Sequence, residues 1–270
     1  MVVQHNLAAA NTNRQLGIIT SEQSKSTEKL SSGYRINRAG DDAAGLSISE
    51  KMRSQIRGLD KASSNAQDGI SLIQTAEGAL NETHSILQRM NELATQAAND
   101  TNTSVDRRAI QKEVDALASE ISRISSTTQF NTMNLLDGKF TGKNLQIGAL
   151  ANQSIAIKID AMDAKTLGVN ALKVSDFAKA GAAMKSIQTA IDKVSTQRSS
   201  LGAIQNRLEH TIKNLDTTSE NTSSAESRIR DTDMAKEMVT YSKNNILMQA
   251  GQSMLAQANQ QNQGVLSLIQ

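Results

Sequence analysis

The sequence predicts a mainly α protein: a long antiparallel helical bundle or coiled coil, with paired terminal helices and a small β-hairpin region. Proline, which breaks helix interiors, is absent from all 270 residues. Aromatic residues make up only 2% of the chain, so the core must consist of Leu, Ile, Met, Val and Ala. Apolar residues also recur at helical spacing over most of the length. These three observations favour long helix seams over a compact core packed around aromatic rings.

The most regular helical pattern lies in the first half of the chain. One apolar position recurs every seven residues, at Met52, Leu59, Ala66, Ile73, Leu80, Leu87 and Ala94. Such a repeat is the heptad seam of a coiled coil. A second apolar stripe consists of Ile86, Met90, Leu93 and Ala97. A helix with two stripes is buried on two sides, so we expect a bundle partner on one side and a neighbouring subunit on the other.

Shorter elements and a second long helix follow. Residues 99–104 are expected to form a turn, and a companion helix with apolar residues from Ile110 to Ile124 comes after it. Glycines then separate short runs, in which residues 154–160 alternate apolar and polar side chains like a strand. The second long helix begins near Ser175 and is expected to break at residues 221–224.

The two ends of the chain carry a modest apolar load. Residues 1–34 and 231–270 are expected to be helical, and because the chain goes out and returns, they should lie side by side. Burying one large apolar side chain gives about 1.5–3 kcal/mol, whereas fixing each residue's backbone costs about 1–2 kcal/mol. Such helices are marginal alone. The pattern therefore predicts a subunit that polymerises through its ends, with order completed by neighbouring copies.

Composition argues against several classes of function. The net charge is +2, and basic residues are interspersed with acidic ones, so no nucleic-acid surface is predicted. Without cysteine there is no disulfide, thiol nucleophile or Cys-based metal site. No stretch is apolar enough for membrane insertion, and the first residues lack the pattern of a secretory signal. We expect the chain to be cytosolic, or exported by a route that does not cleave a signal.

No catalytic, cofactor-binding or metal-binding residues are predicted. Asp41 and Asp42 stand in a glycine-flanked connector, where helix capping and hydrogen bonds between subunits are expected rather than metal binding. His84 falls on the heptad seam as a packing residue, and zinc-protease, dinucleotide and phosphate-loop motifs are missing. The pattern is that of a structural protein and not of an enzyme.

Five segments carry a specific family resemblance. They are residues 3–11 (VQHNLAAAN), 30–37 (LSSGYRIN), 39–46 (AGDDAAGL), 227–235 (SRIRDTDMA) and 246–260 (ILMQAGQSMLAQANQ). The first two and the last two resemble the N-terminal and C-terminal signatures of bacterial flagellins, and the third resembles the connector that follows the N-terminal helix. The chain is similar to flagellins over almost its whole length.

The resemblance implies a division into domains. Residues 1–34 and 235–270 resemble the terminal helices of the inner tube, and residues 35–46 resemble the spoke connector. Residues 47–234 resemble the rod-shaped helical domain, with the β-hairpin region at about 130–165. The short distance between the companion helix and the returning helix implies a flagellin without variable outer domains.

The resemblance also implies a function and a set of partners. The expected function is that of a structural subunit, exported unfolded through the flagellar type III secretion apparatus and self-assembled into an extracellular filament for motility. The expected partners are further copies of the chain, an export chaperone at the C-terminal helix, and the filament cap and hook–filament junction proteins. No cofactor is expected. Two alternatives stay open: a hook–filament junction protein, or a coiled-coil adaptor that does not polymerise.

The assembly residues expected in the terminal helices and the spoke are Leu7, Leu16, Leu30, Arg35, Asn37, Asp41, Asp42, Met238, Tyr241, Met248, Leu255 and Leu268. A further segment, residues 88–93, resembles the part of flagellin bound by the flagellin-sensing Toll-like receptor of animal hosts. Arg89 and Leu93 share one helix face that is expected to point away from the heptad seam. Glu113 takes the matching place on the companion helix. The same face is expected to pack against other subunits in the filament, so the receptor is expected to bind the monomer and not the intact filament.

Overall fold

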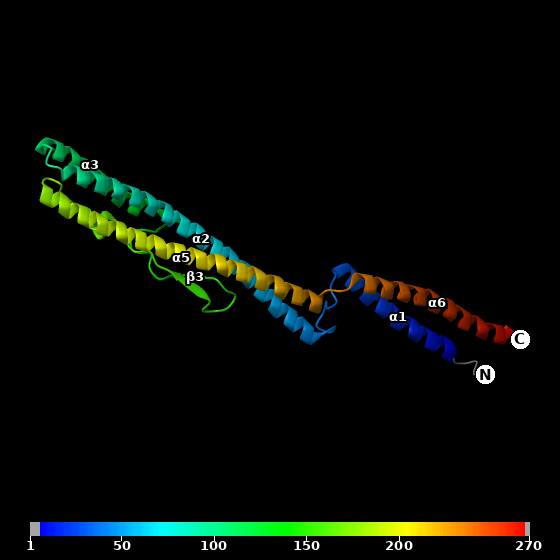
Figure 1. The fold of residues 1–270 in the computed structure, drawn as a ribbon. Coiled ribbons are helices and arrows are strands. Elements are labelled where there is room, and N and C mark those ends of the chain that lie inside the picture. Colours follow the sequence, from blue (N-terminus) through cyan, green and yellow to red (C-terminus); the bar gives the residue numbers. More distant parts are fainter. Residues whose placement is uncertain (1–5, 268–270) are drawn as a thin grey trace. The chain divides into compact units, whose positions relative to one another are not determined.

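The computed structural model describes the backbone of residues 6–267 and the side chains of residues 6–260. Its helices are α1 (Leu7–Ser32), α2 (Ala43–Ala97), α3 (Ser104–Thr127), α4 (Ala164–Leu167), α5 (Phe177–Arg230) and α6 (Met234–Ser267) (Figure 1). Its strands are β1 (Gln129–Phe130), β2 (Met133–Asn134), β3 (Lys143–Gln146) and β4 (Ser154–Ile157). The predicted fold class is confirmed. The chain divides into two compact units: unit 1 (Met1–Ser54 with Glu220–Gln270) and unit 2 (Gln55–Ser219).

In unit 2, α2 and α5 pack along the predicted heptad seam. The seam residues from Leu59 to Ala94 are all buried, against buried apolar residues of α5. Two polar contacts define the direction of the pair. Ser63 donates a hydrogen bond to Asp216 at 3.0 Å, and Arg198 forms an ion pair with Glu77 at 3.6 Å. Residue numbers rise along α2 as they fall along α5, so the helices are antiparallel, as predicted.

The second apolar stripe of α2 is covered by α3 of the same chain. Met90 and Leu93 are 0% and 2% exposed, and they belong to one core with the buried face of α3. An ion pair between Arg89 and Glu113 also joins the two helices. The expectation that a neighbouring subunit covers this stripe is therefore wrong. Periodicity predicts that a helix face is buried, but it does not say which chain buries it.

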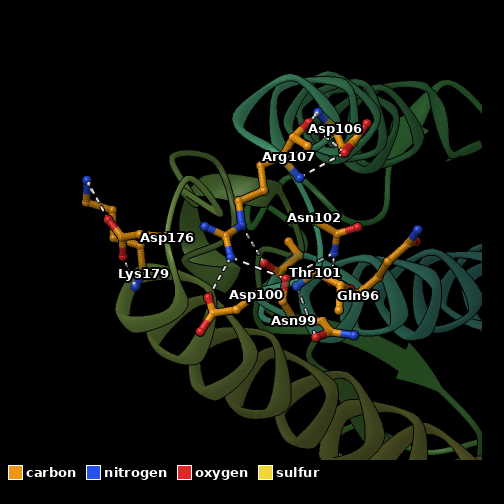
Figure 2. Close-up of polar contacts among 11 residues, drawn as sticks. Gln96, Asn99, Asp100, Thr101, Asn102, Asp106, Arg107, Asp176 and Lys179 are labelled. Atoms are coloured by element: carbon orange, nitrogen blue, oxygen red, sulfur yellow. Dashed lines mark hydrogen bonds and ion pairs between the residues drawn. The ribbon is translucent and has the colours of Figure 1, made fainter.

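A polar network holds the turn between α2 and α3 (Figure 2). Arg107 donates to the carbonyl oxygen of the last residue of α2 at 3.0 Å and pairs with Asp100 at 2.9 Å. At the start of α3, the side chains of Thr103 and Asp106 each accept a hydrogen bond from the other residue's backbone N–H, which is a capping box. These contacts satisfy backbone groups that helix ends leave without partners. The predicted turn at residues 99–104 is confirmed.

The β-structure consists of two short antiparallel hairpins in unit 2, β1–β2 and β3–β4. The alternating pattern of residues 154–160 does form a strand, Ser154–Ile157, with Ile155 and Ile157 buried in the core. The β3–β4 hairpin lies close against α2, because a side chain at Gly69 would collide with Leu145. The predicted hairpin region therefore exists, and it packs onto the long helix rather than standing apart.

The predicted break in the second long helix is wrong. Residues 221–224, Asn-Thr-Ser-Ser, lie inside α5, which continues unbroken to Arg230. Their helix propensities differ from that of alanine by at most about 0.7 kcal/mol per residue. Helix formation is cooperative, so a short unfavourable run with helix on both sides remains helical. The real break comes at residues 231–233, between α5 and α6.

A candidate assembly surface in the terminal helices

In unit 1, the connector after α1 is joined to the connector before α6. The α1 helix ends at Gly33, whose φ of 75° is in the left-handed region that glycine adopts without strain. The Gly33 carbonyl accepts a hydrogen bond from Thr232 N–H at 2.9 Å, and Arg35 N–H donates to the Arg230 carbonyl at 2.7 Å. The Arg35 side chain also donates to the Ile229 carbonyl. The ends of α1 and α5 are thereby held together.

Arg230 and Tyr34 complete this junction. The guanidinium carbon of Arg230 lies 4.8 Å from the centre of the Tyr34 ring, within the range of a cation–π contact. Arg230 also pairs with Glu50 of α2 at 2.8 Å, and its side chain is only 12% exposed. Ile36, two residues after Tyr34, is 2% exposed. Arg35, one of the expected spoke residues, thus forms its hydrogen bonds at this junction within its own chain.

The two aspartates of the connector cap and close backbone turns. The Asp41 carboxylate accepts hydrogen bonds from Asn37 N–H at 3.1 Å and Arg38 N–H at 3.0 Å. The Asp42 carboxylate accepts one from Gly45 N–H at 2.8 Å, in the first turn of α2. Helix capping is thus confirmed for Asp42, whereas Asp41 closes the connector loop, and the expected hydrogen bonds between subunits stay a prediction. The last residues of the expected connector, 43–46, already belong to α2.

The described residues also contain no group of three His, Cys, Asp or Glu side chains placed to hold a metal ion. Within the same part of the chain, no helix combines the length and the hydropathy needed to cross a bilayer.

Acid is expected to open the connector loop through Asp41. Hydrogen bonds from Arg38 N–H and then Asn37 N–H lower the pKa of Asp41 below its ordinary value of 3.8. Because the pKa is lower in the folded loop, this stabilisation is complete above pH 3.8 and is lost as the pH falls through the lowered pKa. The NMR shifts of the Asn37 and Arg38 amides should report that transition. Asp41→Asn should remove it, and wild-type amides that do not change in acid would contradict the prediction.

The terminal helices α1 and α6 pack side by side and antiparallel, as predicted (Figure 1). Asn6 at the start of α1 donates to the Ala258 carbonyl at 2.9 Å, and Ser26 near its end donates to Glu237. The residues that face the partner helix recur three and four apart. On α1 they are Ala9, Thr12, Leu16, Ile19, Gln23, Ser26 and Leu30; on α6 they are Glu237, Tyr241, Asn244, Met248, Gly251, Leu255 and Ala258. Gly251 allows close approach, because a Cβ atom there would lie 3.3 Å from Leu16.

The two most deeply buried positions of this helix pair are polar. Among the described side chains of α1 and α6, only Ser26 and Asn244 are fully buried, each 1% exposed. The Gln23 Oε1 and Asn244 Oδ1 atoms are buried without a hydrogen-bond partner among the described residues. A buried polar atom without a partner costs about 1–3 kcal/mol. The pair is therefore only weakly stabilised by its own interior.

Several large apolar residues are exposed on the outside of the same pair. Leu7, Val239 and Ile246 are 74%, 70% and 67% exposed. Other large apolar residues with high exposure in the pair are Ile18, Met234, Met238, Leu247 and Met254. Part of α6 forms a shallow groove of about 450 Å³ lined by Met238, Val239, Ser242, Lys243 and Ile246. This concentration of exposed large apolar residues on the terminal pair marks an interaction surface.

The sequence-predicted assembly residues divide between the two sides of the pair. Leu16, Leu30, Tyr241, Met248 and Leu255 are half-buried on the α1–α6 seam. Leu7 and Met238 are exposed, and Asn37 donates within the connector to Tyr34 O at 3.3 Å. Leu268 lies outside the described residues. Val239 and Ile246 were missed because the apolar residues of α6 fall on all sides of the helix, so no single stripe indicates an outer face.

The expected receptor-binding residues lie on unit 2, and one of them is not available. Arg89 is exposed and pairs with Glu113 at 3.0 Å and with Glu92 at 3.1 Å. Leu93 is only 2% exposed, so the expectation that its side chain can reach a partner is wrong. The reason is that α3 folds back over the face of α2 on which Leu93 lies. Arg89 and Glu113 remain accessible together, as a pair.

Comparison with known proteins agrees with these features. The family models described as the bacterial flagellin N-terminal helical region and C-terminal helical region match residues 3–141 and 184–269. The chain is 56% identical over 271 residues to a flagellin of Halalkalibacterium halodurans and 54% identical over 304 residues to a flagellin of Bacillus subtilis. Each comparison covers 100% of both chains.

A solved structure is also similar. The crystal structure of Bacillus cereus flagellin matches with a TM-score of 0.50 and 35% identity, covering 56% of this chain and 88% of that chain. Flagellins are structural proteins and not enzymes, in agreement with the absence of a catalytic pattern in the sequence. The family models and the full-length identity together assign the chain to the bacterial flagellin family.

Proposed function

We propose that this flagellin is the structural subunit of an extracellular flagellar filament that serves motility, and that its copies join through α1 and α6. The observation that carries the proposal is that large apolar residues of the terminal pair are exposed, while its two fully buried positions are the polar Ser26 and Asn244. Copies packed against Val239 and Ile246 would supply the burial that the isolated pair lacks. The joined connectors, with Arg35 and Asp41, hold the bases of both helices during that packing.

The distribution of charge supports an inner position for the ends. The sequence has no charged residue from position 244 to position 270. In a helical polymer, each charge close to the axis would face the same charge on neighbouring copies, and like charges repel. We assign residues 1–34 and 235–270 to the inner tube, residues 35–46 to the spoke and residues 47–234 to the surrounding helical domain.

The proposed subunit has no outer domain. The residues between the two family matches, 142–183, contain only the β3–β4 hairpin, the short helix α4 and the start of α5. They contribute buried residues to the core of unit 2 rather than forming a core of their own.

We assign export to the flagellar type III secretion apparatus. A chain without cysteine or proline can be threaded unfolded without disulfide cross-links or slow prolyl isomerisation. The exposed apolar face of α6 would need protection before assembly, which is the work of an export chaperone. The ends of the polymer would meet the filament cap and the hook–filament junction proteins.

Assembly of the purified full-length chain tests the proposal. Val239→Asp with Ile246→Asp is expected to raise the critical concentration about 100-fold or more, since each apolar side chain contributes about 1.5–3 kcal/mol when buried. Val239→Leu with Ile246→Leu, which keeps the surface apolar, is the matched control and should assemble normally. Electron microscopy and sedimentation measure the polymer.

The outcomes separate the alternatives. Equal critical concentrations for both double variants would refute the proposed surface. A wild-type chain that adds to filament ends without elongating would indicate a hook–filament junction protein, and one that stays monomeric would indicate a coiled-coil adaptor. The family match favours flagellin over both.

A second proposed role is recognition of the monomer by the flagellin-sensing Toll-like receptor of animal hosts, through Arg89 and Glu113. The side chain of Arg89 extends from α2 and is half-exposed. Arginine is a frequent anchor of protein interfaces. Arg89→Ala is expected to weaken receptor binding about tenfold or more. Arg123→Ala, which removes a similar exposed pair with Glu120 on α3, is the matched control. Equal binding by both variants would argue against this surface.

A further inference from the structure

Methionine is the side chain of this protein that peroxides oxidise most readily. The chain has no cysteine and no tryptophan, but it has ten methionines. Hydrogen peroxide and organic hydroperoxides therefore find methionine thioethers as their main targets in the protein. Which methionines react depends on exposure, because the oxidant must reach the sulfur.

Burial divides the methionines into distinct groups. Met90 and Met162 are 0% and 5% exposed in the core of unit 2. Met234, Met238 and Met254 are 47%, 51% and 57% exposed, and all three are on α6. Met248, also on α6, is half-buried on the seam with α1. The most exposed of these methionines therefore lie on α6, among the exposed apolar residues of the terminal pair.

Met238 also lines the shallow groove on α6 with Val239 and Ile246. A thioether in that groove is an apolar and adaptable contact for another copy of the chain. A sulfoxide at the same place is polar and chiral, and it would have to lose its hydration on assembly. Oxidation therefore changes the property of the surface on which packing depends.

We propose that Met234, Met238 and Met254 are oxidation sites through which peroxides prevent the subunit from assembling. This inference rests on the proposed function of α6 in assembly. In the reaction, one peroxide oxygen is transferred to the methionine sulfur. The O–O bond breaks, an S–O bond forms, the sulfur loses two electrons, and hydrogen peroxide is reduced to water.

The same geometry makes the effect selective for the free subunit. In the polymer, the outer face of α6 is covered by other copies, so its methionines are shielded from the oxidant. An assembled filament would be resistant, whereas subunits not yet assembled would be blocked. A methionine sulfoxide reductase would reverse the block by restoring the thioether.

The first measurement maps the reactive sites in the full-length chain. Monomer and polymer are treated with hydrogen peroxide, and oxidation of each methionine is followed by peptide mass spectrometry. In the monomer, Met238 and Met254 are expected to react about tenfold faster than Met90, and in the polymer they should be protected. Monomer sites that react no faster than Met90, or polymer sites that react as fast as monomer sites, would overturn the proposal.

The second measurement tests the consequence for assembly. Oxidation is expected to raise the critical concentration of the wild-type chain about tenfold or more, because a buried apolar contact is lost. Met234→Leu, Met238→Leu and Met254→Leu combined should keep the surface apolar and make assembly insensitive to peroxide. Met133→Leu, at a 39% exposed methionine in unit 2, is the matched control and should remain sensitive. Circular dichroism checks that each variant is helical.

The outcomes distinguish this inference from the proposed function. If the triple variant loses assembly after peroxide as strongly as the wild type, the three sites are not responsible and the inference fails. The inference also fails if the oxidised wild type assembles normally, or if the two methionine sulfoxide reductases that act on the two sulfoxide epimers, added together with a thiol reductant, do not restore assembly. An untreated wild-type chain that never polymerises would overturn the proposed function itself, and this inference with it.

Discussion

Removing residues 235–270 is expected to abolish polymer formation while unit 2 stays folded. The main hydrophobic core, from Ala66 to Leu208, lies entirely within unit 2, so its stability does not depend on α6. The deletion removes the exposed apolar residues of α6 and leaves α1 without a partner, and an isolated helix of that kind is marginal in water. Sedimentation and electron microscopy measure the polymer, and circular dichroism measures the remaining helix.

Deletion of residues 1–34 should have the same effect, because α1 and α6 pack on each other. The full-length chain, purified in parallel, is the control for both truncations. Filaments formed by either truncated protein would show that assembly does not require the terminal pair. A truncated protein that loses the cooperative unfolding transition of unit 2 would instead show that this unit depends on the ends.

Ile73→Ala is expected to lower the free energy of unfolding of unit 2 by about 2–5 kcal/mol. Ile73 is 0% exposed at the centre of the α2 seam, so the substitution removes buried methyl groups and leaves a cavity that a long helix cannot close. Ile187→Ala on α5 should have a similar effect, because Ile187 is also 0% exposed. Chemical denaturation followed by circular dichroism gives the free energy.

The control for the core substitution is Thr75→Ala, two residues along the same helix. Thr75 is exposed and its hydroxyl donates only to the Ser71 carbonyl within α2, so its loss should cost less than about 0.5 kcal/mol. Ile191, on the same face of α5 as Ile187, is half-buried and should give an intermediate value. Equal losses at Ile73 and Thr75 would contradict the packing of α2 on α5.

Several features could be predicted from the sequence because local chemistry requires them. The heptad from Leu59 to Ala94 needs a partner helix at every turn, and each of its positions is buried. Gly33 permits the left-handed residue that ends α1. Asp42 accepts a hydrogen bond from Gly45 N–H in the first turn of α2, as an aspartate in a connector before a helix commonly does.

Other features could not be predicted because they depend on which elements meet in space. The two apolar stripes on α2 each require a packing partner. Only the structure shows that the partner of the second stripe is α3 of the same chain, which buries Leu93. The polar residues at 221–224 weaken a helix locally, yet cooperativity along α5 outweighs their propensity.

The sequence by itself determined the helical fold class, the heptad seam and the family resemblance, because each depends on residue type and spacing along one chain. Only the tertiary structure decided which apolar residues of the terminal helices remain exposed. Val239 and Met248 are both apolar residues of α6, but Met248 is half-buried against α1 whereas Val239 is 70% exposed. That difference arises because α1 covers only one side of α6. The side that α1 leaves uncovered is the surface available to neighbouring copies.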